Sequence, residues 1–464
     1  MKLELYGRAV DMRRLVLLVV VPLACLAVAA MLLMPPQFAR LALELAIVLP
    51  VALILIDRPA VIFYALIIIL FSNLDVYAPF RLYRVIVILT IASFALMAAT
   101  GRRIVSHNPL LVALIAAFMI VAFQSLSVAR EYGMGLRKFS QVFKWLVVMW
   151  VAAQFVRDRK EFRRLLLVLA AGILMADLLP FVLHPPARFA SHSLLWSRGV
   201  VRYEGFVFEP NTFAMYQIFL IPVLIFFIGS YPRPRLARAL LLAAILASVF
   251  VLILSFSRGG FVGFVCLLAT LIIIERRNKP VFFSGIALIA AGMVILPGVY
   301  WDRVKSVLEF ASRGGGDSAI STRLDTMKIA IKLGLTNPLL GVGIDNFMTR
   351  AGHFIPYGLT VHNTPLQIFS ELGIVALAAF VGIVVYNFTI IRRLMERRED
   401  PEAARIGRAL FIQQTAMLAT ILFLPGAYEM VFWFMIVLPA MAAYAYRREA
   451  PAVSGAEGDP TGRK

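Results

Sequence analysis

Apolar runs of about 20 residues recur along the whole chain, and each has the length of a helix that crosses a bilayer. By window and flank we count about 14 of them. They begin near Leu15, Leu41, Ala60, Val85, Pro109, Phe139, Leu165, Thr212, Leu236, Gly259, Val281, Pro365, Gly407 and Glu429. Hydrophobic residues make up 61% of the 464 residues, a share that a soluble domain cannot bury. The sequence therefore predicts an all-α, polytopic membrane protein.

The runs divide the chain into one transmembrane domain, residues 1–446, and a tail. The second and third runs are short and share a tight turn at Asp57, so either 12 or 14 spans are expected. Two outward-facing loops are long, residues 183–211 and 301–363. Residues 447–464 are rich in glycine, proline and charge, and we expect a disordered cytoplasmic tail.

Lysine and arginine give the chain a formal net charge of +20, and their placement indicates topology. Basic clusters such as "GRR" at Gly101, "RDRKEFRR" at Arg157 and "IRRLMERRED" at Ile391 fall in alternate loops. Because lysine and arginine mark cytoplasmic loops, both termini are predicted to be cytoplasmic. No basic patch lies on a soluble domain, so nucleic-acid binding is not expected.

The second long loop is predicted to contain an amphipathic helix. Ser321 is a candidate N-cap, and Leu324, Met327, Ala330 and Ile331 recur at the spacing of one helical face. Lysines fall on the other side. A helix of this kind lies at a membrane surface, here the outer one.

Ionisable residues within the spans map to the outer halves. They are Glu44, Lys144, Asp177, Arg258, Glu371 and Glu429. Charges near helix ends can extend to water, which is an equally good explanation for Glu44, Lys144 and Glu429 taken singly. The cytoplasmic halves show no matching set, so the pattern favours a polar cavity open only to the external face.

Three arginines lie where that cavity would be. Arg202 is in "RYEGFVFEPN", Arg258 in "SFSRGG" and Arg323 in "STRLDTM". A guanidinium keeps its charge and offers a planar fork of donors that suits phosphate oxygens. Taken singly, each arginine could instead bind a lipid headgroup or pair with a carboxylate such as Glu204 or Glu209. Together they indicate a pyrophosphate whose lipid tail stays in the bilayer.

His362 supplies a candidate base. It lies in "TVHNTPLQIFSELG", at the outer end of the twelfth run, and Glu371 follows nine residues later. A neutral imidazole accepts a proton from an attacking hydroxyl near pH 7. Asn363 could orient it or bind sugar hydroxyls. The alternative is a histidine that caps the helix and hydrogen-bonds locally.

The order of the motifs resembles the O-antigen ligase and O-antigen polymerase superfamily. "RYEGFVFEPN", "SFSRGG", "STRLDTMKIAIKLGLTNPLLGVGIDNF" and "VHNTPLQIFSELG" follow one another as in that family, over residues 202–373. The spacing from His362 to Gly373 is similar to the family signature. The resemblance implies a GT-C-like helical fold and an inverting, metal-independent glycan transferase in the bacterial inner membrane. It uses no cofactor and acts at the periplasmic face.

Residue roles follow from the resemblance. The donor would be an undecaprenyl-pyrophosphate-linked glycan, and Arg202 and Arg258 would bind its pyrophosphate. Arg323 would assist and His362 would activate the acceptor hydroxyl. Further candidates for substrate contacts are Asn211, Asn363 and Glu371. The sequence shows no His, Asp or Glu cluster with metal-ligand spacing.

The acceptor stays open. Lipid A core is expected for a ligase, a second lipid-linked glycan for a polymerase, and a protein hydroxyl is a third possibility in the superfamily. Ligases are expected to show a small or hydroxylated residue shortly after the glycine, whereas here Ile374, Val375 and Ala376 follow Gly373. A flippase or exporter of lipid-linked sugars is the alternative from another class. It would need charges along a path through the cytoplasmic half.

Overall fold

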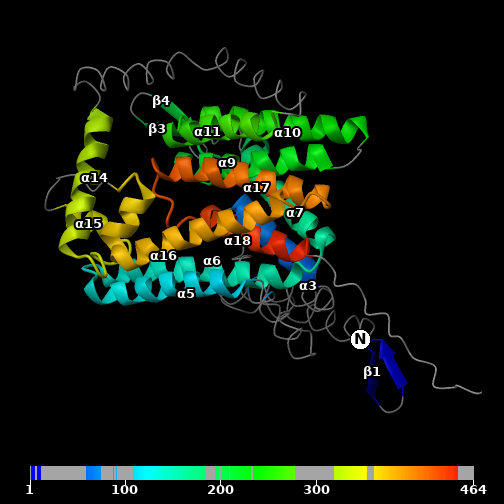
Figure 1. The fold of residues 1–464 in the computed structure, drawn as a ribbon, viewed down its shortest axis with the longest axis horizontal. Helices are drawn as coiled ribbons and strands as arrows, with labels where there is room; N and C mark the ends of the chain where they lie inside the picture. Colours follow the sequence, from blue (N-terminus) through cyan, green and yellow to red (C-terminus); the bar gives the residue numbers. More distant parts are fainter. Residues whose placement is uncertain are drawn as a thin grey trace, which may run out of the picture.

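The chain is described here from a computed structural model, shown in Figure 1. The structure describes residues 2–5, 8–11, 59–74, 87, 90, 108–183, 194–197, 200–207, 209–230, 234–276, 318–352 and 360–447. Most of the helices run side by side as a bundle, and α14 crosses one end of it (Figure 1). The predicted all-α membrane architecture is confirmed.

The helices of the described residues have the following bounds. They are α3 (Pro59–Ser72), α5 (Pro109–Gln124), the 3-10 helix η2 (Ser125–Val128), α6 (Tyr132–Phe155), α7 (Arg159–Leu183), α9 (Pro210–Ser230), α10 (Arg235–Leu254), α11 (Arg258–Ile274), α14 (Ser318–Thr336), α15 (Phe347–Ala351), α16 (Thr364–Met395), α17 (Pro401–Ile421) and α18 (Met430–Ala445).

Two short antiparallel hairpins accompany the helices. One pairs β1 (Lys2–Leu5) with β2 (Arg8–Asp11), and the other pairs β3 (Leu194–Ser197) with β4 (Val200–Tyr203). The second hairpin lies in the first long loop of the predicted topology, opposite Ser255 of the turn that precedes α11.

Ten of the predicted spans correspond to helices of the structure, and those predicted from Leu15, Leu41, Val85 and Val281 lie outside the described residues. Within the described part, five helices are long and apolar enough to cross a membrane: α5 with η2, α7, α9, α10 and α16. Three shorter apolar helices, α3, α11 and α18, accompany them. The choice between 12 and 14 spans remains a prediction.

Local sequence signals explain where several helices begin. Prolines stand at the first or second position of α5, α16 and α17, where the missing N–H costs no hydrogen bond. Side chains of Asn108, Ser257, Asn363 and Asp400 accept from backbone amides in the first turn of the helix that follows each of them.

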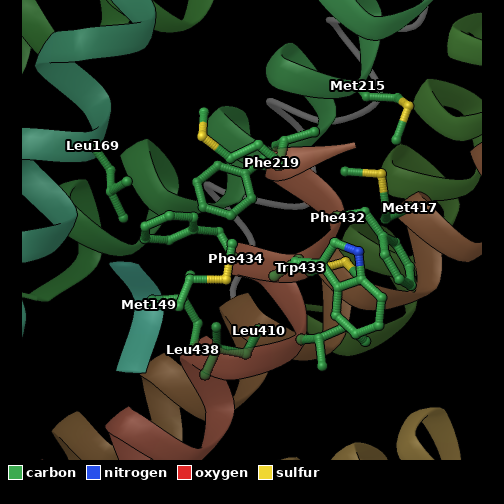
Figure 2. Packing of buried hydrophobic residues seen from close by; sticks show 14 of the residues in the cluster. Met149, Leu169, Met215, Phe219, Leu410, Met417, Phe432, Trp433, Phe434 and Leu438 are labelled. Carbon is green, nitrogen blue, oxygen red and sulfur yellow. The ribbon is translucent and has the colours of Figure 1, made fainter. Parts of the chain in front are cut away.

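Helix α18 forms the centre of the core. Figure 2 shows Phe432, Trp433 and Phe434 surrounded by side chains of other helices, among them Met417 and Phe219. These five side chains are 0–1% exposed. A helix that is apolar on every side is buried on every side, and α18 is the example here.

Ion pairs gather at one end of the bundle, which we name the basic end. The guanidinium of Arg159 meets the Asp400 carboxylate at 3.1 and 2.5 Å, and Arg163 lies 3.1 Å from Glu402. Tyr446, after α18, also donates to Glu402, at 2.7 Å. The basic clusters at the start of α7 and the end of α16 therefore share one end, as the alternating loops predicted.

The predicted amphipathic helix is α14, which runs transverse to the bundle in Figure 1. It begins at Ser318, so Ser321 lies inside the helix, and the predicted N-cap is wrong. Ala330 of the predicted apolar face is buried, whereas Leu324 and Ile331 are 41% and 44% exposed. Ala330 packs inward together with Leu333, because α14 rests on α15 and α16. Contact of the exposed apolar residues with the membrane surface stays a prediction.

Candidate active site

Arg202 lies on β4, and two acceptors hold its guanidinium. Its Nε donates to the carbonyl of Ser255 at 2.8 Å, and its Nη2 donates to Asn211 Oδ1 at 3.1 Å. The same Asn211 oxygen accepts from the Ser257 hydroxyl at 2.9 Å. Arg258 is the first residue of α11, directly after Ser257. Three predicted site residues, Arg202, Asn211 and Arg258, therefore lie on adjoining segments, which we name the arginine corner.

The "RYEG" motif explains how Arg202 reaches that corner. The hydroxyl of the next residue, Tyr203, donates to the Asp177 carbonyl of α7 at 2.5 Å. Its ring meets Phe213 of α9 edge-on at 5.4 Å. Gly205 has φ +55°, and a Cβ there would stand 2.7 Å from the Phe213 ring, so only glycine fits this turn. The buried tyrosine thus fixes β4 on α7 and α9.

His362 precedes α16 and is half-buried. The N-cap of α16 is its neighbour Asn363, whose Oδ1 accepts from Leu366 N at 2.9 Å, so His362 does not cap the helix. The Asn363 amide also donates to the carbonyl of Leu422 at 3.0 Å. These bonds fix the backbone that carries His362. A contact between Asn363 and sugar hydroxyls stays a prediction.

The loop between α17 and α18 connects His362 with the arginine corner. The Thr364 hydroxyl, at the start of α16, donates to the carbonyl of Leu424 at 2.8 Å. The side chain of the same Leu424 packs on Gly259, where a Cβ would meet its Cγ at 2.6 Å. Gly259 follows Arg258 directly. The starts of α11 and α16 therefore both contact Leu424. We name this end of the bundle the site end.

Glu371 is buried, with 4% of its surface exposed, and both of its carboxylate oxygens are used. Oε1 accepts from Phe347 N at 3.3 Å. Oε2 accepts from Asp345 N at 3.1 Å and from the Tyr428 hydroxyl at 2.5 Å. The carboxylate joins the loop before α15 to the loop before α18. These hydrogen bonds give Glu371 a structural role. Its contact with substrate stays a prediction.

A break in α16 explains the glycines of the last two motifs. Gly373 has φ +83° and ψ −175°, a conformation that essentially only glycine adopts. Because the helix is broken there, the Glu371 carbonyl accepts from Gly343 N at 3.0 Å, and Ile374 N donates to the Pro338 carbonyl at 2.7 Å. A Cβ on Gly341 would stand 2.3 Å from the Glu371 carbonyl carbon. The backbone of residues 338–343 is thus in direct contact with the backbone of α16 at its break.

Arg323 is carried by α14, on the described segment that crosses the site end. Its carbonyl accepts from the Thr326 hydroxyl at 2.8 Å, and its side chain is half-buried. Further along α14, Gly334 packs against the ring of Phe369 in α16. Arg323 therefore belongs to a helix that rests on the turns of α16 that follow His362. Its predicted role remains untested.

Residues 242–381 match a family model described as O-antigen ligase. This part of the chain is similar to O-antigen ligases. The match runs from α10 into α16 and includes Arg258, Arg323 and His362, whereas Arg202 and Asn211 precede it. The resemblance to the O-antigen ligase and polymerase superfamily is confirmed over these residues. No curated protein matches the chain.

The structure adds a cation that was not among the predicted site residues. Lys138, half-buried on α6, interacts by charge with the carboxylates of Asp345 and Glu429. Burial raises the pKa of Asp345, and Lys138 and the arginine before it oppose that shift. The sequence predicts a span that begins near Phe139, whereas α6 begins at Tyr132, so Lys138 lies inside the helix.

Two carboxylates lie beside the arginine corner. Burial raises the pKa of Glu204, Glu209 raises it further, and Arg202 opposes the shift. Glu209 accepts from Thr212 N at 2.5 Å at the start of α9 and from the Asn211 amide at 2.8 Å. The arginine fork is therefore surrounded by groups that fix its direction and leave the corner polar.

Proposed function

We propose that this protein transfers a glycan from an undecaprenyl-pyrophosphate carrier to an acceptor hydroxyl. In this proposal His362 is the general base, and Arg202 and Arg258 bind the pyrophosphate. One observation carries it. Gly259, next to Arg258, and Thr364, at the start of α16, both contact Leu424, so the groups that would bind phosphate and the candidate base lie at one end of the bundle.

The reaction needs little beyond these groups. The acceptor oxygen attacks the anomeric carbon of the glycan, and its proton passes to the His362 imidazole. A new carbon–oxygen bond forms while the bond to the pyrophosphate breaks, and the polyprenyl pyrophosphate leaves with the electron pair. Attack opposite the leaving group inverts the anomeric centre. A pyrophosphate is a good leaving group, and fixed positive charge stabilises the negative charge that develops on it as the bond breaks.

The arginine corner suits such a leaving group for two reasons. Arg202 is already held by Ser255 and Asn211, so its fork has less freedom to lose when a ligand binds. The N-termini of α9 and α11 also meet there, since Asn211 and Ser257 are hydrogen-bonded. Helix N-termini carry partial positive charge and favour phosphate groups. Independence of metals and cofactors is part of the proposal.

The location and acceptor follow the same proposal. The site end would face the periplasm, and the basic end with both termini would face the cytoplasm of a bacterium. The acceptor is lipid A core for a ligase. A polymerase would instead use a second lipid-linked glycan, and a protein hydroxyl is the third candidate.

Complementation of a deletion strain tests the proposal. The strain receives the natural chain, His362→Ala, or Thr360→Ala as the matched control, because Thr360 is an exposed neighbour of His362. We expect His362→Ala to abolish glycan attachment and Thr360→Ala to preserve it.

The accumulated lipid identifies the acceptor. Long lipid-linked polymer with bare lipid A core supports a ligase, single lipid-linked repeat units support a polymerase, and unglycosylated protein supports a protein acceptor. Normal surface glycan with His362→Ala would remove the histidine from the mechanism. Lipid-linked glycan retained on the cytoplasmic side would replace the proposal with a flippase.

A further inference from the structure

A groove of about 870 Å³ lies between α5 and α6, with Val437 and Ala440 of α18 on its floor. That volume is typical of a ligand site. Its lining is apolar except at two amide residues, Asn108 and Gln124. These stand at the N-cap and the last residue of α5, so the groove follows the whole helix.

The groove is long and continuous. Sixteen residues separate Asn108 from Gln124, which is roughly 24 Å at helical rise and spans most of a hydrocarbon core. Helix α5 makes most of its contacts with α16 and few with α6, which leaves the space between α5 and α6 open. Helix α5 packs on α16, where a Cβ on Gly382 would stand 3.4 Å from the Leu114 side chain. It meets α6 through the rings of Phe123 and Phe139, whose centroids are 5.4 Å apart. A single extended apolar chain fits this shape.

The aromatic end of the groove borders the site end. Phe139 follows Lys138, whose charge interacts with Asp345 and Glu429. Glu429 is the N-cap of α18, and the same helix forms the groove floor two to three turns later. A lipid with an anionic head and one long tail would thus find a cation at the head and an apolar track below it.

We propose that this groove holds the polyisoprenoid chain of the lipid carrier, an inference that rests on the function proposed above. The chain lies along α5 and α6 from Phe139 toward Asn108, and its phosphate emerges beside Lys138. A single groove without branches fits one long isoprenoid chain better than the two acyl chains of a phospholipid.

A pair of alanines on α5 provides the test. Ala116 lines the groove and is exposed, so Ala116→Trp fills the groove without entering the core. Ala113 is equally exposed on the same helix but does not line the groove, and Ala113→Trp is the matched control. The full chain in nanodiscs is titrated with long-chain polyprenyl phosphate and with a three-isoprene analogue, both without glycan.

We expect Ala116→Trp to weaken binding of the long chain by about tenfold or more, the effect of losing roughly one side chain's worth of apolar contact. The three-isoprene analogue should show a smaller loss, and Ala113→Trp should change neither. Equal binding of the long chain by both variants would overturn the inference.

Photo-crosslinking separates the occupants. A photoreactive phenylalanine analogue replaces Val147 in the groove or Leu240, an exposed residue of α10, in the full chain in native membranes. Isoprenoid adducts enriched at Val147 support the proposal. Adducts with phospholipid alone, or crosslinks to another part of the same chain, would reject it.

The two proposals fail in different ways. If Ala116→Trp blocks binding of polyprenyl phosphate but the natural chain transfers no glycan, the groove stands and the transferase proposal fails. If glycan transfer proceeds normally in Ala116→Trp with long-chain donor, the transferase proposal stands and the groove inference fails.

Discussion

The Nη2 atom of Arg202 donates to Asn211 Oδ1 at 3.1 Å, so one predicted substrate-binding residue positions another. The Ser257 hydroxyl shares that oxygen. Asn211 therefore aligns β4 with the start of α11. Its contribution to the site is argued from this geometry, since it lies outside the residues that match the O-antigen ligase family.

Asn211→Ala removes the acceptor shared by Arg202 and Ser257. A hydrogen bond to a charged group contributes about 1.5–3 kcal/mol, so kcat/KM for the donor should fall about 10- to 100-fold. Steady-state transfer in nanodiscs measures this. Asn337→Ala, at an exposed position after α14, is the control and should remain active. Unchanged kcat/KM in Asn211→Ala would show that the arginine needs no positioning.

Arg202→Lys keeps the charge but loses the fork. A lysine cannot donate to the Ser255 carbonyl and to Asn211 Oδ1 and still present a planar pair of donors to phosphate. We expect donor KM to rise about tenfold while the melting temperature changes little. Arg238→Lys, an exposed arginine of α10, is the matched substitution and should behave as the natural chain. Full activity of Arg202→Lys would argue for a simple electrostatic role.

Glu371→Ala leaves two buried amides and the Tyr428 hydroxyl without their acceptor. Each such group costs about 1–3 kcal/mol, so the free energy of unfolding should fall by about 3 kcal/mol or more. Tyr428→Phe removes one of these bonds and should cost about 1 kcal/mol. Thermal melting measures both variants, and hydrogen exchange should rise at Asp345 and Phe347 in Glu371→Ala. A stable but inactive Glu371→Ala would support substrate contact instead.

Gly373→Ala tests the break in α16. The new Cβ would stand 2.4 Å from the Leu339 carbonyl oxygen at a φ of +83°, so we expect a loss of about 3 kcal/mol or more. Gly382→Ala lies on the same helix, where the nearest contact is 3.4 Å, and should be neutral or slightly stabilising. Melting temperatures of the two variants compare them. Equal stability would mean that α16 can straighten.

Glu204→Gln tests the buried carboxyl beside Arg202. Its pKa is raised above 4.5 by burial, so the folded state binds the proton more tightly than the unfolded state. Stability is then highest below the unfolded pKa and is lost as pH rises from 4.5 through the raised folded value. Glutamine carries no charge at any pH. The variant should therefore melt with the natural chain near pH 4 and at a higher temperature than the natural chain at pH 8. The opposite trend would mean that the Arg202 charge outweighs burial.

The sequence alone determined the class of protein, the position of the described spans and the order of the motifs. These follow from local properties, because the length of an apolar run and the residues at its ends depend on the bilayer and on helix capping. The spans predicted to begin near Pro109, Thr212 and Pro365 begin at Pro109, Pro210 and Thr364 in the structure.

Only the tertiary structure decided which polar groups meet. Arg202 and Ser255 are 53 residues apart, and Tyr428 and Glu371 are 57 apart, so neither bond leaves a periodic pattern in the sequence. The helix contacts that bring them together also place Lys138 at the site end. They also leave the groove between α5 and α6 open, because α5 packs mainly on α16. The local sequence pattern indicates which residues are buried and where helices begin. The contacts between these polar groups depend instead on how helices far apart in the sequence pack together.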